Sequence, residues 1–415
     1  MAYVPRIVDQ EIRDLLSTIG SVVIDGPRAC GKTETARQQA ASEILLDLDV
    51  QAAEAIAIDP SILLEGAVPR LLDEWQTYPA LWNHVRRAVD DRNSPGQFLL
   101  TGSATPIDDQ TRHSGAGRFG RVQMRPMTLT ELGRSTAEIS LAALLAGGGS
   151  RSPETGLTLH DLIDEIVRGG WPGMRHLAPS QATRLIRDYL NRIRRTDIAA
   201  VDGVRRDPER LGAVLQSVAR NVATQASLTT IARDASGSGT TVTDDTVSDY
   251  LSALTRLMVV EDQPAWNTHL RSSHRLRGAP TRHFVDPSLA VAALGATGDT
   301  LRADLSALGL LFESLVIRDL RVYAQPFGGA VFHYRDQSGL EVDAIVDAGK
   351  VWGAFEAKLG TGQIDVAAES LKKFAARVDT ARRGKPAVLG VIVGGGYGFV
   401  RADGIHVIPI GALGP

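Results

Sequence analysis

The feature that most constrains this chain is an eight-residue segment near its N-terminus, which fits the pattern G-x-x-x-x-G-K-[ST]. The segment reads Gly26-Pro27-Arg28-Ala29-Cys30-Gly31-Lys32-Thr33. The residues Val22–Asp25 before it are typical of a short buried strand, and Thr35–Ile44 after it is predicted to be a helix. In such a strand–loop–helix unit, backbone N–H groups and the helix N-terminus face bound phosphates. The sequence therefore predicts an α/β fold with a parallel sheet and a nucleotide-binding loop at residues 26–33.

Lysine usage supports this interpretation. Of the 45 Lys and Arg residues only six are Lys, and Lys32 is the only Lys among the first 349 residues. Because Arg fills nearly every other basic position, a Lys where the motif requires one is informative. The alternative, an incidental Lys in a glycine-rich turn, is disfavoured by this scarcity. Lys32 is expected to contact the β- and γ-phosphates of ATP, and the Thr33 hydroxyl is expected to bind Mg²⁺.

Paired carboxylates follow about 40 residues after the loop, at Asp73 and Glu74. Asp73 is expected to hold the Mg²⁺ shell, and Glu74 to polarise the attacking water. The apolar run before them is short and contains a Pro and an Arg, so the pair alone is a weak signal. The next predicted strand, 98–103, comes where such a domain requires it. Thr101 or Ser103 at its end is a candidate sensor of the γ-phosphate.

Two further residues near the predicted site have competing interpretations. Arg118 is a candidate transition-state arginine, acting in its own chain or in a neighbouring subunit of a homo-oligomer, or else a surface arginine in a glycine-rich loop. Cys30 most simply fills a free position of the loop with a small side chain. A thiol at a helix N-terminus can also have a lowered pKa, and we then expect its alkylation to block nucleotide binding.

Composition excludes several classes of protein. Hydrophobic residues make up 43% of the 415 residues and charged residues 22%, which excludes a largely disordered chain. The longest uncharged apolar run, Ala387–Val400, has 14 residues and is too short to predict a membrane span. The first residues do not resemble a secretory signal, and a single Cys excludes a disulfide framework, so a cytoplasmic location is expected. The net charge of −3 means that any contact with nucleic acid must be local.

The middle of the chain is predicted to be helical. A glycine-rich linker at 147–153 precedes two helices, Leu157–Val167 and Gln181–Ile198, which are expected to form a lid. Three more helices are predicted at Leu211–Ala223, Leu228–Ala235 and Asp244–Met258, followed by wing strands within Val259–Trp266, which is a winged-helix pattern.

This winged-helix pattern favours a protein partner over DNA, because Asp244 and Asp245 would repel phosphates at the start of the third helix. A second candidate contact with DNA or RNA is the segment His269–His283, which holds four Arg and three His and no acidic residue. The alternative for that segment is a solvated, flexible loop.

The C-terminal hundred residues contain a second constellation. Alternation in Leu340–Val346 predicts a strand with Glu341 and Asp343 on one face, and the next strand places Glu356 and Lys358 on one face. A hairpin of these strands would bring Asp343, Glu356 and Lys358 together, joined by Glu313 from a helix over 305–320. Two carboxylates can hold Mg²⁺ while a Lys orients water. The group resembles the core of restriction-endonuclease-like nucleases, whose signature is Asp followed by Glu-x-Lys. A cross-strand ion pair on a solvated sheet and a catalytically dead site are the alternatives.

The ordered set of motifs resembles the prokaryotic AAA-type ATPases that carry a C-terminal domain of unknown function. The segments that carry this resemblance are 3–9, the phosphate loop, 73–76, 101–103, 117–119, 169–172, 195–198, 284–286, 341–343 and 356–358. The resemblance implies an AAA-like ATPase domain at 1–146, a linker and helical lid at 147–205, a winged-helix domain at 206–285 and a nuclease-like domain at 286–415. Trp75 departs from the family pattern, where an aliphatic residue is usual.

Three functions remain open at this point. The first is Mg²⁺-dependent ATP hydrolysis at Lys32, Thr33, Asp73 and Glu74, which drives a change in the C-terminal domain. The second is an ATP-gated nuclease acting on DNA or RNA. The third is a non-catalytic switch or adaptor that binds ATP without turnover.

Overall fold

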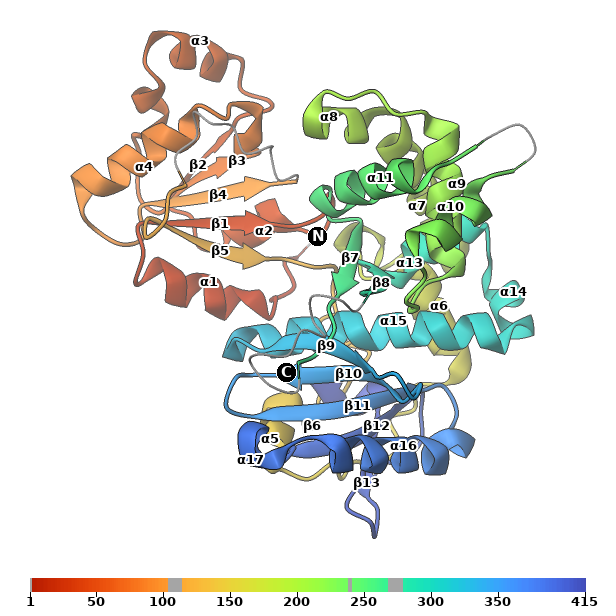
Figure 1. Ribbon diagram of the computed structural model, residues 1–415. Coiled ribbons are helices and arrows are strands. Elements are labelled where there is room, and N and C mark those ends of the chain that lie inside the picture. Colours follow the sequence, from red (N-terminus) through yellow and green to blue (C-terminus); the bar gives the residue numbers. More distant parts are fainter. Residues whose placement is uncertain (1, 104–113, 238–240, 268–278) are drawn as a thin grey trace. The chain divides into compact units, whose positions relative to one another are not determined.

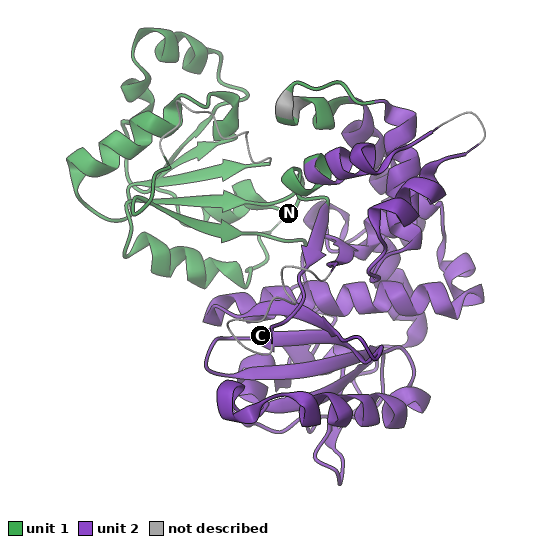
Figure 2. Cartoon of the chain, viewed as in Figure 1, with its two compact units in different colours: residues 1–126, 196–206, 253–259 green, residues 127–195, 207–252, 260–415 purple. Residues whose placement is uncertain are grey.

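The computed structural model describes residues 2–103, 114–237, 241–267 and 279–415 (Figure 1). The chain divides into two compact units, which Figure 2 colours separately. Unit 1 contains residues 1–126, 196–206 and 253–259, and unit 2 contains residues 127–195, 207–252 and 260–415.

Unit 1 is built on a five-stranded parallel sheet in the order β2-β3-β4-β1-β5. Its strands are β1 (Ser21–Asp25), β2 (Ser42–Leu45), β3 (Arg70–Asp73), β4 (Phe98–Gly102) and β5 (Phe119–Gln123). Its helical segments are α1 (Val8–Leu16), α2 (Lys32–Arg37), α3 (Val50–Ile58), η1 (Pro60–Leu64), η2 (Trp75–Thr77), α4 (Leu81–Arg92) and α8 (Ile198–Asp202). Strands β1 and β4 are buried almost throughout, which is why both read as continuous apolar runs.

The core of unit 1 is rich in aromatic side chains. Trp75 and Trp82 pack with ring centroids 5.1 Å apart, and Trp82 stacks on Phe119 at 3.9 Å. Phe98 and Leu100 of β4 belong to the same buried cluster. These side chains form a buried apolar cluster together with residues of β1, β2, β3 and β4.

Unit 2 contains a six-stranded mixed sheet in the order β13-β14-β12-β11-β10-β9. Its strands are β9 (Ala330–Arg335), β10 (Glu341–Asp347), β11 (Trp352–Lys358), β12 (Val388–Val393), β13 (Phe399–Val400) and β14 (His406–Pro409). Strands β9, β10 and β11 are antiparallel neighbours, whereas β11, β12 and β14 run parallel. Helices α15 (Leu305–Ala324) and α16 (Ile364–Arg377) lie on opposite sides of this sheet (Figure 1).

The rest of unit 2 is mainly helical. It comprises α5 (Leu141–Leu145), α6 (Leu159–Arg168), η3 (Pro172–Met174), α7 (Pro179–Arg192), the π-helix η4 (Ile193–Asp197), α9 (Pro208–Arg220), α10 (Leu228–Ala235), α11 (Asp244–Arg256), α13 (Pro287–Leu294), α14 (Gly298–Ala303), η5 (Gln325–Phe327), η6 (Thr361–Gln363), α17 (Thr380–Arg383) and η7 (Ile410–Ala412). The last residues of η4 and of α11 are counted with unit 1. Two short sheets pair β7 (Val260–Gln263) with β8 (Thr281–Phe284) and β6 (Ile139–Ser140) with β15 (Leu413–Gly414).

The predicted elements are largely present, with two exceptions. Helices α9, α10 and α11 lie where three helices were predicted, but only β7 lies within the segment Val259–Trp266 predicted to hold both wing strands, and its partner β8 is at Thr281–Phe284. The winged-helix interpretation stays a prediction. The helix predicted over Thr35–Ile44 is wrong after Arg37, because α2 ends there and Ile44 lies in β2. Ile44 is buried in the sheet as a strand residue. Apolar spacing alone does not distinguish a short buried strand from a buried stretch of helix.

The predicted boundary at residue 146 is also corrected by the structure, which ends the first segment of unit 1 at Pro126. The Met127 N–H donates to the carbonyl of Gly170 at 2.6 Å, and β6 pairs in parallel with β15. The glycine-rich segment 147–153 does not separate two units, because Ser152 forms a bridge with Gly398 inside unit 2. The lid predicted for 147–205 likewise belongs mostly to unit 2, where α6 and α7 pack with α13.

Among the described residues, no helix combines the length and apolar character that a bilayer crossing requires.

Candidate functional site

The phosphate loop connects the end of β1 to the first residue of α2. Gly31 adopts a φ of 103° and Ala29 a φ of 63°, so the chain turns sharply in the left-handed region before the helix begins. A Cβ at Gly26 would lie 2.4 Å from the carbonyl oxygen of Met124, at the end of β5. Only glycine therefore fits at the first position of the motif, because the backbone of the neighbouring strand approaches too closely.

Lys32 folds back over the loop from the first turn of α2. Its Nζ donates to the carbonyl oxygens of Gly26 and Pro27, each at 2.9 Å, and the side chain is buried. These contacts hold the ammonium group beside the start of the loop, where phosphate oxygens could replace neutral carbonyls as partners. A charge-assisted contact of that kind is stronger than one to a neutral acceptor.

Thr33, Asp73 and Thr101 meet at the carboxyl end of the sheet of unit 1. The Thr33 hydroxyl donates to Asp73 Oδ1 at 2.8 Å, and the Thr101 hydroxyl donates to the same oxygen. The strand order explains this convergence, since β4 lies between β1 and β3 and its end faces both. Burial raises the pKa of Asp73, although hydrogen bonds from Thr101 and Thr33 oppose the shift. A hydroxyl and a carboxylate with this placement provide the hard oxygen donors that Mg²⁺ prefers, so the residues present fit that ion.

Glu74 is held beside this network by its own partners. It adopts a φ of 54°, in the left-handed region, directly after β3 ends at Asp73. Its carboxylate accepts from the Ser103 hydroxyl at 2.8 Å and from the Gln76 side-chain amide. The Glu74 N–H donates to Thr101 Oγ1 at 3.3 Å. The structure thus brings Lys32, Thr33, Asp73, Glu74, Thr101 and Ser103 to one edge of the sheet.

The N-terminal segment contributes contacts that the motif did not predict. Arg6 is buried and donates to the carbonyl oxygens of Cys30 at 2.9 Å and Arg125 at 2.8 Å. The Tyr3 hydroxyl donates to Asp9 at 2.6 Å, and its oxygen lies 3.2 Å from the Thr35 hydroxyl of α2. The segment therefore joins the phosphate loop to the end of β5. Its only signal in the sequence was its place in the family resemblance, which assigned no role to these residues.

Arg118 is not brought to the phosphate loop of its own chain. It precedes β5, whose first residue pairs with Ser21 at the start of β1, whereas the loop follows the end of β1. Four strand steps, about 13 Å, separate these two edges of the sheet. Its guanidinium instead binds Asp90 at 2.8 Å and the carbonyl of Ala116 at 3.1 Å. The interpretation of Arg118 as a transition-state arginine acting in its own chain is therefore wrong, while action in a neighbouring subunit stays a prediction.

Cys30 is fully buried, with its Sγ 4.0 Å from the Met124 carbonyl oxygen. This position agrees with the simpler interpretation, in which a small side chain fills the loop. The thiol has no exposed surface for a reagent, so an effect of alkylation stays a prediction that requires the loop to open.

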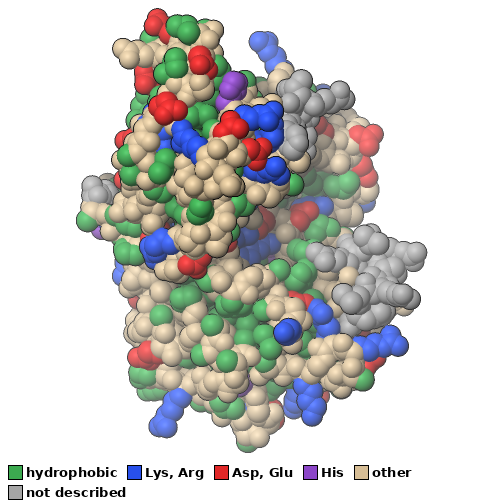
Figure 3. All heavy atoms as spheres, turned by 90° about the vertical axis from the view of Figure 1, so that its left-hand side faces the viewer, with side chains coloured by type: hydrophobic (Ala, Val, Ile, Leu, Met, Phe, Trp, Pro, Cys, Tyr) green, Lys and Arg blue, Asp and Glu red, His purple; other side chains and the backbone are tan. Residues whose placement is uncertain are grey.

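The predicted basic segment His269–His283 lies mostly outside the described residues, and only 279–283 are described. His283 is buried in the core of unit 2, where its ring nitrogens contact Ser314 Oγ at 2.7 Å and Gln263 Oε1 at 3.0 Å. Burial lowers its pKa well below the ordinary value. His283 is therefore not available to a nucleic acid. On the face shown in Figure 3, basic and acidic side chains are interspersed rather than gathered into one basic area.

The carboxyl–lysine cluster predicted in the C-terminal region is assembled. Lys358 Nζ lies 3.0 Å from Asp343 Oδ2 and 2.7 Å from Glu356 Oε2, and the Ala357 N–H also donates to Asp343 at 2.9 Å. Burial and the nearby Asp343 raise the pKa of Glu356 to about 8 and that of Glu313, in α15, well above its ordinary value. Within the described residues, no three His, Cys, Asp or Glu side chains stand in a geometry that would hold a metal ion.

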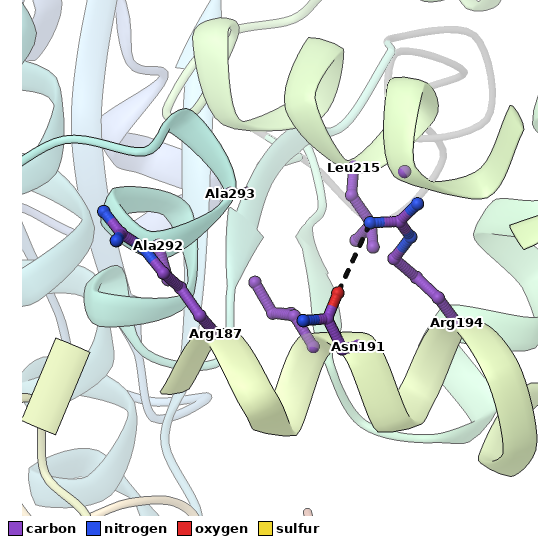
Figure 4. Close-up of a pocket in the computed structure, with 8 residues that line it drawn as sticks. Arg187, Asn191, Arg194, Leu215, Ala292 and Ala293 are labelled. Atoms are coloured by element: carbon purple, nitrogen blue, oxygen red, sulfur yellow. Dashed lines mark hydrogen bonds between the residues drawn. The ribbon is translucent and has the colours of Figure 1, made fainter. Parts of the chain in front are cut away.

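Unit 2 also contains a small open pocket between α7, α9 and α13 (Figure 4). It has a volume of about 200 Å³ and a floor of Leu and Ala side chains. Arg194 lines one end and is already bound to the Pro208 carbonyl at 2.8 Å and to Glu209 at 3.1 Å. Arg187 at the other end contacts the Gly295 carbonyl at 3.3 Å. The two guanidinium groups do not converge, and the catalytic candidates of unit 1 are not part of this pocket.

Three segments of the chain match known families. Residues 20–133 match an AAA domain, while residues 159–300 and 308–413 match two domains of unknown function, DUF8612 and DUF4143. Uncharacterized protein Rv2008c of Mycobacterium tuberculosis and uncharacterized protein Mb2031c of Mycobacterium bovis are each 24% identical to this chain over 405 residues, which is 96% of this chain and 82% of each relative.

Among solved structures, the Walker-type ATPase PABY2304 of Pyrococcus abyssi is similar with a TM-score of 0.43 and 14% identity, covering 69% of this chain and 94% of that one. The match at 308–413 carries no activity, so the nuclease resemblance stays a prediction. The AAA-domain match and the geometry of residues 26–33, 73–74 and 101–103 together support a P-loop ATPase in the first part of the chain.

Proposed function

We propose that unit 1 binds ATP with Mg²⁺ and hydrolyses it. The observation that carries this proposal is the convergence of Lys32, Thr33 and Asp73 at the end of the parallel sheet, with Thr33 hydrogen-bonded to Asp73 at 2.8 Å. A glycine-rich turn that had acquired its motif by chance would have no reason to meet a buried carboxylate on a strand 40 residues away in this way.

Each residue of this edge has a role that its contacts support. Lys32 and the backbone N–H groups of residues 28–33 bind the phosphates, and Thr33 and Asp73 hold Mg²⁺, which when bound neutralises charge on the β- and γ-phosphate oxygens. Glu74 accepts the proton of the attacking water. Ser103 and Gln76 hold the Glu74 carboxylate in place until then.

The nucleotide state of unit 1 is proposed to act on unit 2 through the peptide chain. The chain passes between the units at residues 126–127, 195–196, 206–207, 252–253 and 259–260. Five such connections favour a coupled response over two independent domains on a flexible linker.

Steady-state hydrolysis of ATP tests this function. Lys32→Ala is expected to lose both binding and turnover, whereas Glu74→Gln is expected to keep ATP binding and lose most turnover. Arg37→Ala is a matched control, because Arg37 lies on the same helix but pairs with the exposed Glu34 and Glu43, away from the phosphate loop. Full turnover by Lys32→Ala would place the activity elsewhere. Tight binding without turnover by the wild-type protein would favour a non-catalytic switch instead.

A second candidate function is cleavage of DNA or RNA by the cluster of Glu313, Asp343, Glu356 and Lys358. It is favoured by the position of Lys358 between two carboxylates, which the β10–β11 pairing brings together.

Cleavage of single- and double-stranded DNA and RNA, with and without ATP, tests this second candidate. Loss of cleavage in Asp343→Asn would support it, and equal cleavage by both proteins would rule it out. The same nucleic acids added to the ATPase assay report whether the two activities are linked.

A further inference from the structure

Arg28 in the phosphate loop forms an ion pair that the nucleotide-binding motif does not require. Its guanidinium lies 2.9 Å from Asp197 Oδ1, and both residues belong to unit 1. The Arg28 side chain is 40% exposed, whereas that of Asp197 is only 4% exposed. Arg28 can therefore change its partner without disturbing a packed core, while Asp197 stays fixed.

The position of Arg28 in the loop places it near the terminal phosphates of a bound nucleotide. Lys32, which binds those phosphates in the proposed function, has its ammonium group on the carbonyls of Gly26 and Pro27. Arg28 follows Pro27 directly, and consecutive Cα atoms are only about 3.8 Å apart. An arginine side chain leaving the loop at this point is long enough to contact the group that Lys32 contacts.

Other arginines near this edge are less suited to that role. Arg6 is buried and holds two backbone carbonyls that shape the loop, so its release would deform the site. Arg121, on β5, is bound at 2.7 Å to Asp25, the last residue of β1. Arg118 lies at the opposite edge of the sheet.

We propose that Arg28 is the arginine that stabilises the terminal phosphate during hydrolysis, and that Asp197 controls it by competing for the same guanidinium. This inference rests on the proposed ATPase function. In the step concerned, a water oxygen forms a bond to the γ-phosphorus as the bond from that phosphorus to the β–γ bridging oxygen breaks. The water proton passes to Glu74, ADP leaves with the bonding electrons, and Arg28 donates hydrogen bonds to the γ-phosphate oxygens as charge develops on them.

The location of Asp197 gives this competition a regulatory meaning. It is the last residue of the π-helix η4, a rare element that is frequent at functional sites. It lies in the segment 196–206, which the chain joins to unit 2 at Arg195 and at Asp207. A change in unit 2 that shifts this segment would alter the hold of Asp197 on Arg28, and thereby the rate of hydrolysis.

Turnover and affinity in a set of four proteins test the proposal: wild type, Arg28→Ala, Asp197→Asn and the double variant. Arg28→Ala is expected to lower kcat by roughly tenfold or more while changing the Kd for ATP by less than about threefold. Asp197→Asn is expected to raise kcat by about threefold, because it weakens the competing pair. The double variant is expected to behave like Arg28→Ala.

The affinity for ADP with aluminium fluoride separates the two possible roles of Arg28. A purely structural residue would change this affinity and the affinity for ATP alike. Arg28→Ala should weaken binding of this transition-state mimic by at least about tenfold without a comparable loss for ATP. Arg28→Lys, which keeps the charge but not the forked donors, should recover only part of the rate. Melting curves identify any variant that fails to fold, and Arg28→Gln then replaces Arg28→Ala.

Unchanged kcat in folded Arg28→Ala or Arg28→Gln would overturn the assignment of Arg28. No rise in kcat on Asp197→Asn, or the same fold-change in the wild-type and Arg28→Ala backgrounds, would overturn the control by Asp197. Loss of turnover in Lys32→Ala together with full turnover in Arg28→Ala would reject this inference alone. Turnover in Lys32→Ala would instead reject the ATPase function on which it rests.

Discussion

Arg6 contacts the phosphate loop from outside the nucleotide-binding motif. Because its guanidinium donates to the carbonyls of Cys30 and Arg125, its loss leaves one buried and one partly buried acceptor without a charged donor. We expect Arg6→Ala to weaken ATP binding by about tenfold or more, as measured by titration calorimetry. Arg13→Ala is the matched control, since the Arg13 side chain is exposed on α1 and contacts Gln10. Equal affinities for ATP in the wild-type and Arg6→Ala proteins would show that the loop keeps its shape without Arg6.

Glu356 gives unit 2 a pH dependence opposite in sign to that of an ordinary ion-paired carboxylate. Burial, together with the nearby Asp343, raises its pKa from 4.5 to about 8. Between these two values the folded protein binds more protons than the unfolded chain, so the free energy of unfolding falls as pH rises. We expect the melting temperature of the wild-type protein to decrease from about pH 5 to pH 8.

The variant Glu356→Gln checks this origin of the pH dependence. Its melting temperature is expected to fall less over the same range, because the neutral amide cannot ionise. Glu369→Gln on the exposed face of α16 serves as the control and should follow the wild-type curve. Parallel curves for the wild-type protein and Glu356→Gln would assign the pH dependence to other groups.

At the scale of residues, the sequence predicted which side chains of the motif lie together better than it predicted their surroundings. The phosphate loop, Asp73 and Glu74 were identifiable because the nucleotide-binding pattern fixes their types and spacing, and the structure brings them to one edge of the sheet. Their roles stay proposals. Arg6 could not be identified in this way, because it donates to backbone carbonyls. Every residue type has a backbone carbonyl, so the sequence gives no sign of such a contact. The alternatives for Arg118 stayed open in the sequence, because only the register of β5 against β1 shows which edge of the sheet it occupies.

At the scale of elements, a buried ionic network connects four segments of unit 2. Arg318 in α15 binds Asp286 and Asp319, each at 2.8 Å, and all three side chains are almost fully buried. Asp286 also accepts from the Gly170 N–H at 2.9 Å, and Asp319 accepts from the Leu129 N–H at 3.1 Å. The network therefore joins α15 to the segments at 127–131, 169–171 and 286–288.

Removal of the single cation should destabilise this network strongly. Arg318→Met leaves two buried carboxylates without their shared partner, and we expect a loss of about 3–5 kcal/mol in the free energy of unfolding of unit 2. Urea denaturation followed by tryptophan fluorescence measures it, since Trp171 donates to Ser288 beside this network. Arg302→Met, on the exposed face of α14, is expected to change stability by less than about 1 kcal/mol. A similar loss of unfolding free energy in Arg318→Met and Arg302→Met would mean that the buried network stabilises unit 2 no more than an exposed ion pair does.

Elements were predictable where local pattern and burial agree. Helices α9, α10 and α11 have regular apolar spacing and clear turns between them, so their positions followed from the sequence. The end of the first segment of unit 1, at Pro126, did not follow from the sequence. The glycine-rich segment at 147–153 signals only that the chain is locally irregular. Whether such a segment separates two domains depends on distant pairings, here those of Ile139 with Leu413 and of Ser152 with Gly398.

At the scale of the whole molecule, ATP is expected to alter the segments of unit 1 that interrupt unit 2. Hydrogen exchange with and without ATP should show slower exchange at residues 26–33 and a changed rate at 196–206, because Asp197 contacts Arg28 of the loop. The Lys32→Ala protein should show neither effect. Slower exchange at the loop with no response at 196–206 would contradict the proposed coupling between the two units.

Unit 1 is discontinuous along the chain, and this has a practical consequence. A fragment ending near residue 126 or 146 contains the five-stranded sheet but lacks residues 196–206 and 253–259. Such a fragment would lose Asp197, and with it the proposed brake on Arg28. Under this proposal, a shortened protein would hydrolyse ATP at a rate that Asp197 no longer lowers. Kinetic work on truncated forms would then overestimate the turnover of the 415-residue chain.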